Sequence, residues 1–252
     1  MGYASLTQPT GLLKEDIDNT FSGCQDAHMP EDLKQQYIVK MGEPLGKLFF
    51  ALWNEVAWLH YKWNEYREFF DMKESRIHLM NEAAPMFFRF FQDMLIDDIL
   101  LRIARLTDPP ESRNKANLTI TRLPKFIEEG NITIEVQELI SKALESATFC
   151  RDLRNKRIAH YDLKLALKEG AEFVEPATKE KIQTALDSIV DVMNKVEYHF
   201  RRSTTFYEMG FVPNASVLQL LSLLKRGLKS KKEWLEKLKN GEFNPDDMPG
   251  EI

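Results

Sequence analysis

The residues best suited to chemistry are concentrated in one short segment, residues 151–162, which reads RDLRNKRIAHYD. It holds three arginines, a lysine, an asparagine and a histidine, interrupted by a small apolar pair. Arginine presents a permanently charged planar fork that binds phosphate, and histidine exchanges protons near neutral pH. The combination indicates chemistry on a phosphodiester.

The chemistry of RNA cleavage explains why these residue types belong together. Internal cleavage needs a deprotonated 2′-hydroxyl, a protonated leaving oxygen and stabilised charge on the phosphorane. A histidine can move the proton, and a guanidinium can stabilise the non-bridging oxygens. A basic helix surface is the alternative interpretation, because Asp152 and Lys156 have the spacing of an ion pair and the apolar pair Ile158-Ala159 could face a core.

The spacing within the segment adds a geometric constraint. On a continuous α-helix, Arg154 and His160 would lie about 120° apart around the axis and roughly 9 Å apart along it. They would then not share a face. Either the helix breaks within the motif or a second copy of the chain completes the pocket. We favour the second copy, because a two-fold dimer brings two half-sites together across one groove.

Histidines and carboxylates outside this segment are better explained by structural roles. His78 and Glu82 lie four residues apart on one helical face, but a metal site needs a third and a fourth ligand. His199 is at a predicted helix end, where a cation complements the helix dipole. Asp97 and Asp98 precede two arginines on the same helix, which favours ion pairing over acid–base catalysis. We therefore predict no metal site and no cofactor.

Two further patterns also have structural interpretations. Aromatic residues recur at helical spacing between residues 49 and 91, which indicates a core and a dimer interface more than a platform for stacked bases. Residues 225–239 carry seven lysines or arginines and two glutamates. A solvated helix face is favoured there over a surface that holds a polyanion.

Composition limits the class of protein. The 252 residues have a net charge of −5, which excludes a wholly basic nucleic-acid coat, so RNA or a nucleotide would meet a local basic patch. The two cysteines, Cys24 and Cys150, lack metal-type spacing, which favours a reduced, cytoplasmic compartment. No secretion signal stands out. We also expect no membrane span, since the most apolar stretch, residues 45–61, contains Lys47 and Glu55.

Apolar residues at spacings of three and four predict an all-α helical bundle with two long antiparallel core helices. The first carries an apolar stripe from Leu45 to Leu59 and is predicted to end near Phe70. The second covers roughly residues 76–106, with Pro85 as a kink or a fresh start.

Shorter helices are predicted after a polar connection at residues 111–122. Their ranges are 122–129, 133–149, 161–169, 176–200, 214–227 and 230–240, with a stop at Gly130-Asn131 before the second. We expect residues 1–30 to form a loose arm, residues 31–240 a single all-α domain and residues 241–252 a disordered tail.

The basic motif and its surroundings resemble the HEPN superfamily (higher eukaryotes and prokaryotes nucleotide-binding). The signature of that superfamily is an arginine followed by a polar residue, with a histidine after four to six intervening residues. Arg154, Asn155 and His160 fit it, with five residues between arginine and histidine. The wider resemblance is to the AbiU-type abortive-infection branch, over roughly residues 45–200. It rests on LLRIARLTDPP at 100–110, NLTI at 117–120 and RDLRNKRIAHYDL at 151–163.

This resemblance implies an all-α fold that commonly dimerises and a metal-independent ribonuclease that leaves a 2′,3′-cyclic phosphate and a 5′-hydroxyl. Many members act as toxins or in defence against phage, and some pair with a nucleotidyltransferase-type antitoxin. By resemblance, Arg154 stabilises the phosphate, Asn155 orients it and His160 handles the proton.

Neighbours of these three residues are predicted to contact the RNA because of their position: Lys156, Arg157 and Tyr161. Three functional classes stay open at this point, since a fold alone does not fix a function. They are a ribonuclease, a non-catalytic module that binds RNA or nucleotides, and a helical scaffold or interaction protein.

Overall fold

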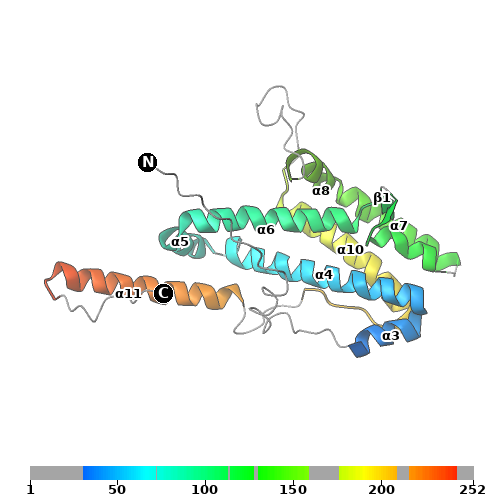
Figure 1. Cartoon of the computed structure of the whole chain (residues 1–252), viewed down its shortest axis with the longest axis horizontal. Coiled ribbons are helices and arrows are strands. Elements are labelled where there is room, and N and C mark those ends of the chain that lie inside the picture. The colour runs from blue at the N-terminus through cyan, green and yellow to red at the C-terminus, as the bar shows by residue number, and fades with distance from the viewer. Residues whose placement is uncertain are drawn as a thin grey trace, which may run out of the picture.

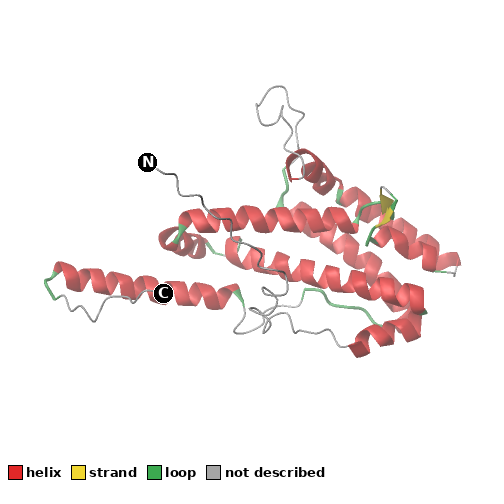
Figure 2. Cartoon of the chain, in the orientation of Figure 1, coloured by secondary structure: helices red, strands yellow, loops and turns green. Residues whose placement is uncertain are grey.

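A computed structural model describes most of the chain between residues 31 and 242. The described ranges are 31–71, 73–112, 114–127, 130–158, 176–208 and 216–242. Within them the chain is almost entirely helical, which confirms the predicted all-α class (Figures 1 and 2). The predicted arm at 1–30 and the helix at 161–169 lie outside the described residues, as does nearly all of the predicted tail, and the domain boundaries stay a prediction.

Eight α-helices are described, and they follow the apolar periodicity of the sequence. They are α3 (Glu31–Met41), α4 (Glu43–Phe70), α5 (Glu74–Ala83), α6 (Pro85–Leu106), α7 (Gly130–Ser146), α8 (Thr148–Leu153), α10 (Lys179–Arg201) and α11 (Val217–Lys239). A 3₁₀-helix spans Ile120–Phe126 and a π-helical turn spans Arg154–Ile158. A two-residue antiparallel pair, β1 (Glu111–Ser112) and β2 (Lys115–Ala116), lies within the predicted polar connection.

The two predicted long helices are α4 and α6, which lie side by side and run in opposite directions (Figure 1). Pro85 occupies the first turn of α6, so the proline starts a new helix after the short helix α5. Proline suits this position because the first turn of a helix has no acceptor for its backbone N–H.

Several helix boundaries differ from the sequence prediction. The helix predicted at 133–149 is divided at Ala147 between α7 and α8, and the one predicted at 122–129 is the 3₁₀-helix at Ile120–Phe126. Gly130 and Asn131 begin α7, whereas the sequence predicted a helix stop there. The two short helices predicted near the C-terminus form one continuous helix, α11, which passes through Gly227. Glycine inside a helix costs only about 1 kcal/mol relative to alanine. The apolar face that α11 packs against α4 and α5 outweighs that cost.

The main core lies between α4, α6, α7 and α10. The predicted stripe on α4 is buried from Leu45 to Leu59 apart from Leu48, which is only partly covered. It meets apolar side chains of α10, among them Ile182 and Ile189. Each fully buried side chain of this size contributes roughly 1.5–3 kcal/mol. This core holds α6 and α7 in place, and α8, which contacts both, leads into the π-helical turn of the basic motif.

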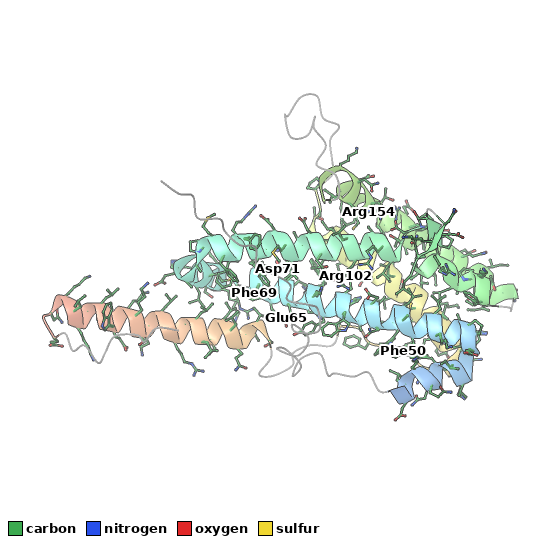
Figure 3. The ribbon with its side chains drawn as sticks, in the orientation of Figure 1. Phe50, Glu65, Phe69, Asp71, Arg102 and Arg154 are labelled. Carbon is green, nitrogen blue, oxygen red and sulfur yellow. The ribbon has the colours of Figure 1, made fainter. Side chains whose placement is uncertain are left out.

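A smaller apolar cluster attaches α11 to the ends of α4, α5 and α6. It buries Phe69, Met80 and Phe88 against Val217 and Leu221. The backbone N–H of Val217 also donates to Oε2 of Glu65 over 2.9 Å, which supplies an acceptor at the start of α11. Figure 3 shows Glu65 and Phe69 near α11, away from Arg154.

A buried carboxylate joins α3, α4 and α10 to the segment after α10. The carboxylate of Glu197, 2% exposed, accepts hydrogen bonds from Tyr37 Oη (3.0 Å), Arg201 (3.0 Å) and Thr205 Oγ1 (2.7 Å). Thr205 Oγ1 in turn accepts from the indole N–H of Trp53 over 2.9 Å. We call these five residues the Glu197 cluster. Its carboxylate is fully hydrogen-bonded, as a buried charge must be.

In the described parts of the chain, no helix combines the length and the apolar character needed to cross a membrane.

Candidate phosphate-binding site

The basic motif lies where the helix geometry changes. Helix α8 ends at Leu153, and the next five residues, Arg154 to Ile158, form a π-helical turn. A π-helical turn holds more residues than an α-helical turn because its hydrogen bonds span five positions, and such turns are frequent at functional sites. The spacing of Arg154 and His160 requires either a break in the helix or a second copy of the chain. The helix geometry does change at Arg154, the first residue of the signature formed by Arg154, Asn155 and His160.

The side chain of Arg154 is held by an acid that the sequence analysis did not select. Its guanidinium donates to Oδ1 and Oδ2 of Asp108, both over 2.7 Å. Its Nε donates to Oδ1 of the neighbouring Asn155 over 3.1 Å. The side chains of Arg154 and Asp108 are 23% and 20% exposed. The pair is therefore partly open to solvent, and its geometry is that of a charge-assisted hydrogen bond.

Asp108 is itself fixed by the turn that follows α6. Its carbonyl oxygen accepts from Thr119 Oγ1 over 2.8 Å and from Thr121 Oγ1 over 3.0 Å. Thr119 Oγ1 also donates to the carbonyl of Leu106 (2.8 Å). No spacing rule connects Asp108 with Arg154, because 46 residues separate them.

Arg151, the first residue of the basic segment, has a structural role. Its guanidinium donates to Thr107 Oγ1 (3.1 Å), to the carbonyl oxygen of Leu144 (2.6 Å) and to Thr148 Oγ1 (3.1 Å). These contacts connect α8 to the end of α6 and to α7. Arg151 therefore fixes α8, the helix that directly precedes Arg154. Figure 3 shows Arg154 where α8 approaches α6.

The structure describes some of the other predicted site residues and not others. Asn155 is exposed and Lys156 is half-buried. Arg157 is described by its backbone alone, and His160 and Tyr161 lie outside the described residues. The structure thus brings Arg154 and Asn155 together with Asp108. The distance from Arg154 to His160 stays a prediction.

A groove of about 440 Å³ lies beside the residue that precedes Arg154. Leu153 and Ala177 contribute to it from one side, and Tyr66, Arg89 and Gln92 from α4 and α6. The amide of Gln92 donates to the hydroxyl of Tyr66 over 3.5 Å. The lining also holds two acids, Asp93 and Asp97, and Arg89 is ion-paired with Asp93, so the groove has no excess of positive charge.

Other titratable groups are occupied in packing or pairing. Burial lowers the pKa of His60 to about 4 and raises the pKa of the Cys150 thiol to about 12. Asp98 accepts from Lys62 over 2.6 Å and from Arg102 over 3.0 Å, which confirms the ion pairing predicted for it. These groups are held as structural partners.

The described residues contain no group of three or more histidines, cysteines, aspartates or glutamates able to hold a metal ion.

An all-α bundle with an Arg-Asn motif at a helix break defines the class of protein that the sequence predicted. The chain belongs to the AbiU2 family of HEPN proteins, whose family model matches residues 42–218. This match confirms the predicted family, and its bounds leave most of α11 outside the matched region. No curated protein and no solved structure matches the chain.

Proposed function

We propose that this chain is a metal-independent endoribonuclease of the toxin or phage-defence type. In the proposed reaction the 2′-oxygen attacks the adjacent phosphorus and the bond from phosphorus to the 5′-oxygen breaks. His160 takes the proton from the 2′-hydroxyl and gives this proton to the leaving 5′-oxygen, so that the histidine ends the reaction in its starting form. The products are a 2′,3′-cyclic phosphate and a 5′-hydroxyl.

The observation that carries the proposal is the environment of Arg154. One nitrogen of its guanidinium, Nη1, already donates to both oxygens of a planar anion, the carboxylate of Asp108, and the side chain remains 23% exposed. A guanidinium that holds a carboxylate here can also hold the oxygens of a phosphate. RNA would compete with Asp108 for Arg154, and the phosphorane would gain the stronger interaction because it carries more charge.

Asn155 supports the same role. Its side-chain oxygen accepts from Nε of Arg154, which restrains the orientation of the guanidinium. Its amide nitrogen remains available to orient the phosphate. Beyond these two residues, we propose that Lys156, Arg157 and Tyr161 contact the flanking RNA, as the sequence suggested.

The proposal includes a homodimer, and an exposed apolar stripe on α6 supports it. Met86, Phe87, Phe90 and Met94 are 80%, 59%, 62% and 51% exposed. Four large apolar side chains in a row along one helix are typical of an interface. We also keep as proposals a cytoplasmic location without membrane attachment and a nucleotidyltransferase-type antitoxin as partner.

Cleavage in the presence of EDTA tests the proposal. The wild-type chain should cut RNA and leave cyclic phosphate ends, while Arg154→Ala and His160→Ala should each lose about 10²–10³-fold in rate. Arg226→Ala is the matched control, because Arg226 is an exposed arginine on α11. Structured and unstructured RNA should both be offered over a range of pH.

Two outcomes would count against a ribonuclease. One is equal residual cleavage by the wild type and His160→Ala, and the other is no cleavage by the wild type on any substrate. RNA binding that survives His160→Ala but is lost in Arg154→Ala, without cleavage, would instead identify a binding module. A chain that neither binds nor cuts RNA but copurifies with a protein partner would be a scaffold.

A further inference from the structure

A second groove lies at the opposite end of α7 from the basic motif. Its volume is about 580 Å³, and it lies between the first turns of α7 and the last turns of α10. These two helices pack side by side (Figure 1). The groove is formed by Gly130, Asn131, Ile132 and Glu135 of α7 and by Lys195, Tyr198, His199 and Arg202 at the end of α10.

The lining of this groove holds more basic than acidic side chains. Lys195, His199 and Arg202 come from the α10 side, and Glu135 is the one acid among the lining residues. Glu135 forms an ion pair with Lys195. The remaining positive charge, on Arg202, favours an anionic ligand, and phosphate is the anion that a guanidinium fork binds well.

An aromatic ring stands next to this charge. Tyr198 is 52% exposed, although most large aromatic side chains of the bundle are at least partly buried. The guanidinium carbon of Arg202 lies 5.6 Å from the centroid of the Tyr198 ring. An exposed ring beside an arginine is the arrangement with which proteins bind single-stranded nucleic acid, because any base can stack on the ring.

The backbone at Arg202 is unusual in the same place. Its φ of 55° lies in the left-handed region, and its N–H donates to the carbonyl of Tyr198 over 3.0 Å. Glycine is the usual residue in this conformation at a helix end, because other side chains adopt it at a cost. Glycine would adopt this backbone conformation at lower cost, so the arginine at this position is better explained by its charge than by packing.

We propose that this groove is a subsite for one nucleotide of a single-stranded RNA, with the base on Tyr198 and the phosphate on Arg202. The inference rests on the proposed function, since it assigns the same RNA to both sites. Helix α7 has 17 residues and spans about 25 Å, so an RNA held at Arg154 would reach the groove after several nucleotides. The substrate class is therefore single-stranded RNA longer than the few nucleotides at the motif.

The test measures binding of RNA that cannot be cleaved. Fluorescent 2′-O-methyl oligonucleotides of about 2 to 16 nucleotides are titrated with the full chain in EDTA and followed by anisotropy. The wild type should bind the longest RNA at least about tenfold more tightly than the dinucleotide. Tyr198→Ala and Arg202→Ala should each reduce this ratio about tenfold, whereas Tyr198→Phe keeps the ring and should preserve it.

A substitution of opposite sign strengthens the test. Glu135→Gln removes the one acid of the lining and releases Lys195, so affinity for long RNA should rise. Thermal unfolding followed by circular dichroism checks that each variant is folded.

The outcomes separate this proposal from the proposed function. A wild type that prefers long RNA, with both alanine variants unchanged, overturns the subsite and leaves the motif intact. The subsite is also overturned if the wild type binds RNA of all lengths with equal affinity. The same holds if the alanine substitutions weaken the binding of short and long RNA by the same factor. If adenosine 5′-monophosphate displaces long RNA as well as unlabelled RNA does, the groove is a site for free nucleotides. A wild type that binds no RNA contradicts both proposals.

Discussion

Two arginine–carboxylate pairs in this molecule have the same chemistry and different surroundings. Arg201 and Glu197 belong to the Glu197 cluster, where the side chain of the acid is 3% exposed and that of the arginine 20%, and the acid also accepts from Tyr37 and Thr205. Arg154 and Asp108 form a pair whose side chains are 23% and 20% exposed. The two arginines are about equally exposed, so the pairs differ in the acid: Glu197 is buried among three donors, whereas Asp108 is partly open to solvent.

The difference indicates which pair can exchange its partner. Separating a buried pair leaves an uncompensated charge in a medium of low dielectric, so Arg201 cannot release Glu197 without loss of structure. Separating a partly exposed pair costs little, since water replaces the partner. Arg154 can therefore leave Asp108 for a phosphate, while the Glu197 cluster holds the bundle together.

The largest expected effect comes from breaking the buried pair. Glu197→Ala leaves Arg201, Tyr37 and Thr205 without their acceptor and should lower the free energy of unfolding by about 3–5 kcal/mol. Urea denaturation followed by circular dichroism measures it. Glu197→Gln keeps a carbonyl acceptor and should lose less. A loss below about 1 kcal/mol for Glu197→Ala would remove the contrast between the two pairs.

A pH dependence should arise next to the same buried region. His60 is 1% exposed, its ring lies 5.6 Å from that of Tyr207, and burial lowers its pKa from 6.5 to about 4. The folded state therefore keeps His60 neutral. Its contribution to stability is complete above pH 6.5 and is lost as the pH falls from 6.5 towards 4, by roughly 3 kcal/mol in total.

Denaturation at a series of pH values measures this dependence. His60→Leu removes the titrating group, so the variant should lose less stability than the wild type between pH 6.5 and 4. Equal slopes for the two chains would show that His60 is charged or solvated in the folded state.

A smaller change sharpens the description of the Glu197 cluster. Tyr37→Phe removes a hydrogen bond to a charged group and should lower the free energy of unfolding by about 1.5–3 kcal/mol. Tyr198→Phe is the matched control, because Tyr198 is 52% exposed and should change stability by less than about 0.5 kcal/mol. Equal effects of the two substitutions would mean that the buried hydrogen bond adds nothing.

The smallest effect on stability is expected at the partly exposed pair of Arg154 and Asp108. Asp108→Asn should change the free energy of unfolding by less than about 1 kcal/mol and raise RNA affinity up to about fivefold, since Arg154 loses its competing anion. Asp152→Asn is the control for the change in net charge, because Asp152 is an exposed acid in the basic segment 151–162. A destabilisation as large as that of Glu197→Ala would make the Asp108 pair structural.

Much of the fold could be predicted because its signals are local. The stripe from Leu45 to Leu59 and the proline that begins α6 depend on residues within a few turns of one another. The wrong predictions were at glycines. Gly130 begins α7 and does not end a helix, and α11 continues through Gly227, because packing decides whether a helix tolerates a glycine in its interior.

The candidate site could be predicted only in part, because only some of its residues are close to one another in the sequence. Arg154 and Asn155 are adjacent and have a recognisable pattern, so sequence alone selected them. Asp108 is 46 residues away from Arg154, and no periodicity connects the two. The groove beside Tyr198 joins the ends of two helices about 60 residues apart and carries no motif.

The sequence by itself determined the helices, the family and the arginine of the candidate site, since helix formation and short motifs depend on neighbouring residues. Only the tertiary structure decided which charges are buried and which stay open to a ligand. That decision depends on the water excluded when distant helices pack. Glu197 became part of the core and Arg154 remained at the surface for this reason.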